Sequence, residues 1–156
     1  MSEIIKSMVR PLQLSDIPIV ATIAETAMPF PWGQAVFKDC LKADYHAWVV
    51  TLGDHGFANE VLGFVVLLVQ VGEAQMLNIA VRPQHQGRGL GKVLLEHAIS
   101  SSKQLDVQKM VIEVRASNLQ AIAFYQRMGF LQVGMRREYY PHEDGREDAL
   151  LFCLAI

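Results

Sequence analysis

The sequence lacks the cysteine and histidine patterns of disulfide-linked, redox and metal-binding proteins. Its 156 residues include only two cysteines, Cys40 and Cys153, which form neither a CxxC pair nor a disulfide framework. We expect both to be free thiols in the core of a protein from a reducing, cytoplasmic compartment. The five histidines are scattered and show no HxxxH, HExxH or Cys/His spacing, so we expect no metal site.

Long apolar runs and basic clusters are missing as well. The longest apolar stretch, residues 61–69 interrupted by Gly63, is too short to span a bilayer. The amino terminus lacks a basic segment followed by an apolar one, so we expect neither a membrane anchor nor a secretion signal. The net charge is −2, the pI is about 6.2 and no basic run exceeds Arg136-Arg137, which argues against a nucleic-acid surface.

What the chain does contain predicts one globular domain over residues 1–156. Apolar residues make up 51% and charged residues 19% of the chain, which are the proportions of a water-soluble protein with an ordinary core. No internal repeat or low-complexity linker divides the sequence. We expect a monomer or a weak dimer.

Apolar periodicity predicts the element order β-α-α-β-β-β-α-β-α-β-β, which is a mixed α/β fold. Helices are predicted after Ser15, at 34–41, at 90–104 and after Asn118, with Ser15 and Asn118 as caps and Gly129 just beyond the last helix. A Gly/Asp/His/Asn turn is predicted between the second and third strands, and a polar connection between the last two. The predicted strands are 9–12 (an edge strand because of Pro11), 47–52, 61–71, 74–81, 109–115, 131–136 and 149–154.

A glycine-dense turn joins the strand 74–81 to the helix 90–104. It contains Gly87, Gly89 and Gly91. Such a turn leaves backbone N–H groups unpaired at the positive end of the helix dipole, which predicts a phosphate or pyrophosphate site. Glycine is suited to this position because a side chain would hold the phosphate away from the amides and forbid a positive φ.

The spacing of this turn separates three kinds of phosphate site. A P-loop would need glycine where Gln86 stands and a hydroxyl where Val93 stands. A dinucleotide fingerprint would need its third glycine one residue after Gly91, and Asp106 follows a polar helix end instead of a strand. The remaining pattern, Gln86-x-x-Gly89-x-Gly91, resembles the acetyl-CoA pyrophosphate loop of the GNAT superfamily of N-acetyltransferases. Taken alone, a glycine turn also fits a structural helix start.

Later segments carry a more specific resemblance. Residues 111–118 (VIEVRASN) and 121–130 (AIAFYQRMGF) resemble the second half of a GNAT cofactor site. Residues 136–141 (RREYYP) and 144–149 (DGREDA), together with Glu25-x-Ala27 and Pro31-Trp32, resemble the bacterial ribosomal-protein-alanine N-acetyltransferases of the RimI type. The similarity covers nearly the whole chain.

This resemblance implies a fold and an activity. The fold is the acyl-CoA N-acyltransferase fold, a central mixed, mostly antiparallel sheet flanked by helices. The activity is transfer of acetyl from acetyl-CoA, without a metal, to the N-terminal amine of a ribosomal protein, with alanine as the expected acceptor. The amine attacks directly in a ternary complex, so Cys40 and Cys153 are not expected to become acylated. The alternatives are a lysine or small-amine acetyltransferase of the same fold and a non-catalytic acyl-CoA-binding or sensing module.

Two residues are candidates for proton transfer. An α-amine with a pKa of about 7.7–8.0 must be deprotonated before it attacks, and Glu113 interrupts an apolar strand as a candidate base. The coenzyme A thiolate, with a pKa of about 8.5, can take a proton from the phenol of Tyr125. The alternatives are a solvent-facing carboxylate and a core tyrosine. The match to the family's catalytic residues favours the two catalytic roles.

The resemblance also implies the cofactor-binding residues. The strand ending in Ile79, Ala80 and Val81 would pair with the pantetheine arm, and an N–H near Val81 would stabilise the tetrahedral species. Arg88 and Lys92 would add positive charge, although either can be an ordinary surface cation. Asn118 would contact the cofactor, although helix capping alone explains its identity. The predicted pyrophosphate loop consists of Gly87, Arg88, Gly89, Leu90, Gly91 and Lys92.

Aromatic and acidic residues are candidates for acceptor binding. Tyr139 and Tyr140, expected in the loop between the last two strands, would bind the acceptor backbone, and Trp32 with Phe30 and Pro31 would form the opposite wall. The alternative is that these rings cover the edge of the core. An acidic group would attract a basic peptide, unless these charges are simply solvated. The group comprises Glu143, Asp144, Glu147 and Asp148.

Overall fold

The most apolar strand, β3 (Val61–Gln70), lies inside the sheet with its first seven residues buried. A strand without polar alternation needs cover on both faces, and helices supply it here. The computed structural model describes residues 7–52 and 60–156. The predicted Gly/Asp/His/Asn turn falls at residues 53–59, outside the described residues.

The described residues form one seven-stranded sheet in the order β1-β2-β3-β4-β5-β7-β6. Neighbouring strands are antiparallel except β4 and β5, which are parallel, so the predicted mixed, mostly antiparallel sheet is confirmed. The predicted element order is confirmed as well. The remaining strands are β1 (Ser7–Pro11), β2 (Tyr45–Leu52), β4 (Glu73–Val81), β5 (Lys109–Arg115), β6 (Leu131–His142) and β7 (Gly145–Ala155).

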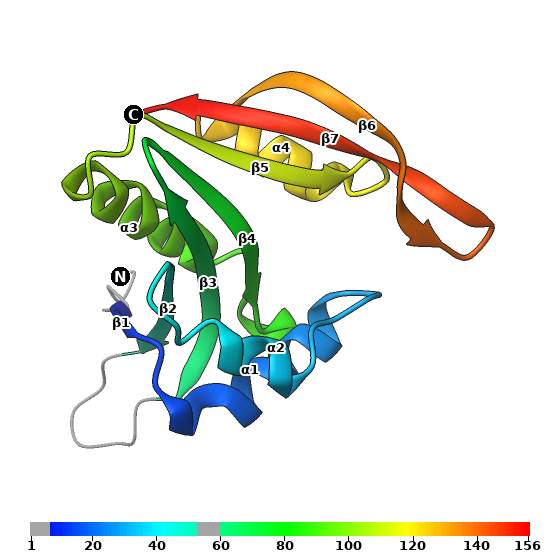
Figure 1. Cartoon of the computed structure of the whole chain (residues 1–156). Coiled ribbons are helices and arrows are strands. Elements are labelled where there is room, and N and C mark those ends of the chain that lie inside the picture. The colour runs from blue at the N-terminus through cyan, green and yellow to red at the C-terminus, as the bar shows by residue number, and fades with distance from the viewer. Residues whose placement is uncertain (1–6, 53–59) are drawn as a thin grey trace, which may run out of the picture.

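The sheet divides the core into two parts, and helices cover the part on each face (Figure 1). On one face, α3 (Leu90–Gln104) and α4 (Leu119–Arg127) bury an apolar cluster that includes Leu94, Met110 and Phe152. On the other face, α1 (Ile17–Ala27) and α2 (Gln34–Asp39) cover β3 and β4 around Phe37 and Phe64. None of the helices in the described part of the chain is both long and apolar enough to cross a membrane.

The sheet opens between β4 and β5, as Figure 1 shows. The two strands pair only from Glu73 to Met76, and β4 beyond that point leaves β5. A β-bulge lies at this point, because Val66 pairs with Asn78 and Leu67 with Met76, which leaves Leu77 as the extra residue. The bulge reverses the alternation of β4 and turns Ile79 and Val81 toward the α3 face.

The predicted cap of the first helix is wrong. Ser15 lies in a short 3-10 turn (Leu14–Asp16) and does not cap α1. Asp16 occupies the position before the helix, where its carboxylate accepts hydrogen bonds from Gln13 N–H at 2.8 Å and from Arg10 at 2.7 Å. The Arg10 hydrogen bond lowers the pKa of Asp16. The local spacing contains no sign of this tertiary ion pair.

The last two strands are longer than predicted. Residues 137–148, expected as a polar connection, belong to a β6–β7 hairpin that turns between His142 and Gly145. Irregular pairing at 132–134 and 136–140, with a positive φ of 51° at Glu138, interrupts the two-residue alternation. Because β6 continues to His142, Tyr139 and Tyr140 lie in this strand and not in the predicted loop.

Gly63→Ala tests the close approach of β3 and β4. A Cβ at Gly63 would lie 2.7 Å from the carbonyl oxygen of Ala80 and 3.3 Å from Leu94, so the strands would have to shift. We expect the substitution to lower the free energy of unfolding by about 1–3 kcal/mol, measured by denaturant unfolding. Gly33→Ala is the control because nothing lies within 4 Å of its Cβ position. Equal stability of the two variants would contradict the prediction.

Candidate active site

A cavity of about 610 Å³ lies where β4 and β5 separate, within the usual size of small-molecule sites. The end of β4, the glycine turn, the start of α3, one face of α4 and the end of α1 line it. The structure therefore brings together nearly all the predicted cofactor-binding residues. Those on the wall are Ile79, Ala80, Val81, Gly87, Gly89, Leu90, Gly91, Lys92 and Asn118.

The glycine turn presents free backbone donors to this cavity. Gly87 and Gly89 have φ values of 81° and 82°, which other residues rarely adopt. Helix α3 begins at Leu90, and no side chain caps it. The N–H groups of Leu90, Gly91 and Lys92 therefore have no partner within the helix and carry the positive end of its dipole. This arrangement suits a phosphate or pyrophosphate.

Side chains next to the turn differ in what they contribute. The amide of Gln86 donates a hydrogen bond to the carbonyl oxygen of Val81 at 3.1 Å and ties the turn to the end of β4. Lys92 lines the cavity and lies 3.9 Å from Glu96. Arg88 is exposed and is not part of the wall, and its guanidinium lies 3.5 Å from Nδ1 of His85.

Helix α4 carries Tyr125 into the cavity wall. Asn118 caps this helix by accepting from the N–H of Ala121 at 3.2 Å, and Gly129 follows its end with a φ of 96°, both as predicted. Tyr125 is only 5% exposed and packs against Phe130. Burial, with a smaller contribution from Tyr140, raises the pKa of Tyr125, so its phenol is protonated at neutral pH.

Sequence reasoning missed much of the α4 wall and the end of α1. The missed residues of this wall lie at i−4, i−3, i+3 and i+4 from Phe124, so helical spacing from Phe124 is the signal that would have found them. At the end of α1, Ala27 and Met28 also reach the cavity, and only the tertiary fold brings them there. The missed α4 residues are Gln120, Ala121, Phe124, Arg127 and Met128.

Glu113 lies on the opposite face of the sheet from Tyr125. Its neighbours Ile112 and Val114 belong to the α3 side of the core, so alternation turns Glu113 away from it. The Glu113 side chain is 18% exposed, and its Oε1 lies 3.3 Å from Nε of Arg136. Burial and then the charge of Glu113 raise the pKa of Tyr140 to about 12. Tyr140 is thus electrostatically coupled to both Glu113 and Tyr125.

The predicted acceptor residues divide into two groups. Tyr139 and Tyr140 pack ring against ring at 5.0 Å on β6. Trp32 lies in the segment between α1 and α2, with its ring 5.4 Å from Phe37 in the core. Trp32 therefore anchors the segment as well as forming part of its surface.

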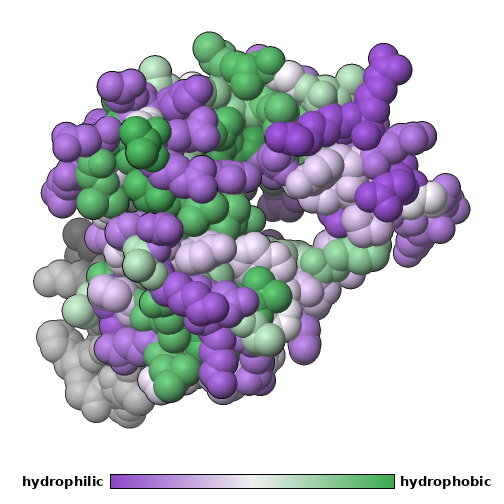
Figure 2. Space-filling view, viewed as in Figure 1, coloured by the Kyte–Doolittle hydropathy of each residue, from purple (hydrophilic) through white to green (hydrophobic). Residues whose placement is uncertain are grey.

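The acidic residues of the hairpin also divide. Glu147 accepts from Arg115 at 3.0 Å and so ties the hairpin to the end of β5, whereas Asp148 accepts from the N–H of Glu138 at 2.9 Å within the hairpin. Glu143 and Asp144 are exposed at its turn. Figure 2 shows hydrophilic side chains over this projecting end of the molecule, at the right of the view.

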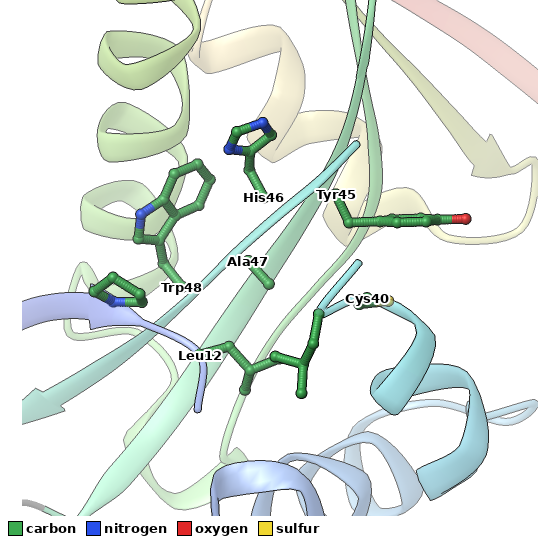
Figure 3. A pocket seen from close by; sticks show the side chains of 8 residues that line it. Leu12, Cys40, Tyr45, His46, Ala47 and Trp48 are labelled. Carbon is green, nitrogen blue, oxygen red and sulfur yellow. The ribbon is translucent and has the colours of Figure 1, made fainter. Parts of the chain in front are cut away.

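A second cavity, of about 230 Å³, lies beside the start of β2 and includes Cys40 (Figure 3). The Cys40 thiol donates to the carbonyl oxygen of Val36 at 3.3 Å, and burial raises its pKa to about 11. It is therefore a thiol at neutral pH and a poor nucleophile. Within residues 7–52 and 60–156, no group of three His, Cys, Asp or Glu side chains is arranged to hold a metal ion.

Comparison with known proteins decides the family. The sequence model of the Acetyltransferase (GNAT) family matches residues 17–130. This chain belongs to the GNAT acetyltransferase family. The sequence prediction, the fold and the glycine turn at the start of α3 agree with this assignment, and the GNAT protein is therefore an acetyltransferase.

Relatives with a more specific description match almost the whole chain. The [ribosomal protein bS18]-alanine N-acetyltransferase of Escherichia coli K12 is 38% identical over 145 residues, 93% of this chain and 95% of the relative. The Salmonella typhimurium LT2 protein of the same description is 39% identical over the same shares. The crystal structure of the ribosomal-protein-S18-alanine N-acetyltransferase from Escherichia coli has a TM-score of 0.86 and 36% identity, covering 97% of this chain and 94% of that chain.

Gly91→Ala separates a requirement of the ligand from a requirement of the fold. A Cβ at Gly91 would lie 3.7 Å from Phe124, an ordinary contact, and its φ is not positive. The protein therefore accommodates alanine, which favours a helix by up to about 1 kcal/mol over glycine. Its methyl group would stand at the wall of the cavity, beside the free amides.

We expect Gly91→Ala to leave the Tm unchanged or raise it, and to weaken acetyl-CoA binding by about tenfold or more in calorimetry, a loss of about 1.4 kcal/mol. Gln104→Ala, at the exposed far end of α3, is the control for binding. Full affinity in Gly91→Ala would mean that the pyrophosphate does not approach these amides.

Proposed function

We propose that this protein transfers acetyl from acetyl-CoA to the N-terminal amine of a ribosomal protein, with the alanine of bS18 as the acceptor. The observation that carries the proposal is the 38% identity, over 93% of the chain, to a protein described as acting on that alanine. A lysine or small-amine acceptor has no such relative behind it here. A non-catalytic sensing module disagrees with membership of an acetyltransferase family.

The free amides at the start of α3 support binding of the acetyl-CoA pyrophosphate, with Lys92 adding charge. Acetyl-CoA supplies an activated acetyl thioester. The open edge of β4, from Ile79 to Val81, is proposed to pair with the pantetheine arm, since β5 has moved away from it. An N–H near Val81 is then placed to stabilise the tetrahedral oxyanion.

Glu113 and Tyr125 are proposed to move the protons on the two sides of this opening. Arg136, whose Nε lies 3.3 Å from Oε1 of Glu113, holds this carboxylate in place. Tyr125 keeps its proton because its pKa is raised, and it can deliver that proton to the departing thiolate in the same buried surroundings. Asn118 and Arg88 would contribute secondary contacts to the cofactor. No acyl-enzyme is needed, which agrees with a Cys40 thiol that stays protonated.

Tyr139 and Tyr140 are proposed to bind the acceptor backbone opposite Trp32. A cytoplasmic location suits an enzyme that modifies a ribosomal protein. The single domain over 1–156, the lack of a metal requirement and the monomeric or weakly dimeric state stay predictions.

The acceptor is tested with synthetic peptides. We expect the enzyme to acetylate an alanine-initiated peptide with a free N-terminus and one internal lysine, and to leave the same peptide with a formylated N-terminus unmodified. Mass spectrometry of the fragments locates the acetyl group. Labelling of the lysine in both peptides would contradict an α-amine acceptor.

Glu113→Gln and Tyr125→Phe test the proton transfers. We expect each to lower kcat by about 10²- to 10⁴-fold while the Kd for acetyl-CoA stays within about twofold. The Glu113→Gln defect should be largest at low pH, where most of the amine is protonated, and shrink above the amine pKa of about 8. A pH-independent loss, or an equal loss of acetyl-CoA binding, would assign Glu113 to architecture.

A further inference from the structure

Arg115, the last residue of β5, lies between two aromatic rings that come from distant parts of the chain. Its guanidinium carbon is 4.5 Å from the centre of the Phe30 ring and 4.4 Å from that of Tyr140. Phe30 belongs to the segment between α1 and α2, whereas Tyr140 belongs to β6. A planar cation between two ring faces joins these segments through cation–π contacts.

Hydrogen bonds fix the same guanidinium in its plane. Nη1 of Arg115 donates to the carbonyl oxygen of Pro141 at 2.7 Å and to Glu147 at 3.0 Å. The second oxygen of Glu147 accepts from the N–H of Ser117 at 3.3 Å. The Arg115 and Glu147 side chains are only 17% and 13% exposed, so solvent screens this pair less than an ordinary surface ion pair.

These contacts lie beside the acceptor side of the opening. Arg115 is two residues from Glu113 and therefore shares its face of β5. Tyr140 is electrostatically coupled to Glu113. Neither of the two core clusters contains Phe30, Arg115 or Tyr140, so this arrangement supports the opening and not the core.

We propose that Arg115 is a positioning residue for the acceptor peptide, which it serves by holding Phe30 and Tyr140 in fixed positions on the acceptor side of the opening. The proposal rests on the proposed function, since it assumes that a polypeptide N-terminus binds against the outer surface of these rings. Arginine is required because a lysine ammonium offers neither a plane to stack between rings nor two fixed hydrogen-bond directions. The effect is on acceptor binding, since no atom of Arg115 is assigned to the reacting groups.

Arg115→Lys keeps the positive charge but removes the planar guanidinium, so it tests whether stacking between the two rings is needed. We expect the KM for the alanine peptide to rise about tenfold, with kcat at saturating peptide, the Kd for acetyl-CoA and the Tm close to those of the wild type. Phe30→Leu, which removes one ring, should raise the same KM, and the double variant should add little because both changes break one arrangement. Arg137→Lys is the control, because Arg137 is exposed on β6 and forms no ion pair or hydrogen bond with the described residues.

The outcomes separate this proposal from the proposed function. An unchanged peptide KM in Arg115→Lys, with an active wild type, overturns the role of Arg115 alone. A parallel loss of Tm and acetyl-CoA affinity also overturns it, because it indicates a purely structural residue. A wild type that acetylates no N-terminal amine overturns the proposed function, and with it the acceptor that Arg115 is proposed to serve.

Discussion

The separation of β4 from β5 is the constraint on which the site depends. Pairing stops at Met76, where the bulge at Leu77 adds a residue and turns Ile79 and Val81 toward α3. A continuous sheet would leave no unpaired backbone edge and no passage from one face to the other. The open edge leaves backbone groups of β4 unpaired by β5, which is the basis of the proposed pairing with the cofactor arm.

The two sides of this opening differ in the groups that form them: backbone amides on one side, and charged and aromatic side chains on the other. The α3 side relies on backbone groups, since free N–H donors at a glycine turn recognise an anion without a precise side-chain position. On the proposed acceptor side, no helix of residues 7–52 and 60–156 packs over the outer part of β5 and β7, so burial alone does not order its side chains. Ion pairs and stacked rings order them, with Arg136 on Glu113 and Arg115 between Phe30 and Tyr140.

Sequence patterns predicted the parts in which local signals and tertiary structure agree. The bounds of α3 and β5 match because each combines strong apolar periodicity with clear ends, and Asn118 and Gly129 follow ordinary capping rules. The prediction that Ser15 caps α1 was wrong, because Asp16, which pairs with Arg10, is the residue before this helix. The length of the β6–β7 hairpin was missed because bulges disturb its alternation. The surroundings of Arg115 were beyond prediction, since they join three segments distant in sequence.

The exposed nature of the proposed acceptor side agrees with the acceptor that we propose. A polypeptide N-terminus is bulky and continuous with a larger molecule, so its groove has to stay open at one end, and covering it with a packed helix would exclude it. An open groove lined only by flexible charged side chains would lose order to solvent and salt. Stacking a guanidinium between aromatic rings, and directing its remaining donors to Pro141 and Glu147, fixes these side chains without covering the proposed acceptor side. Two arginines thus order the β5–β6 part of this face, as the apolar helices α1 and α2 order the part over β3 and β4.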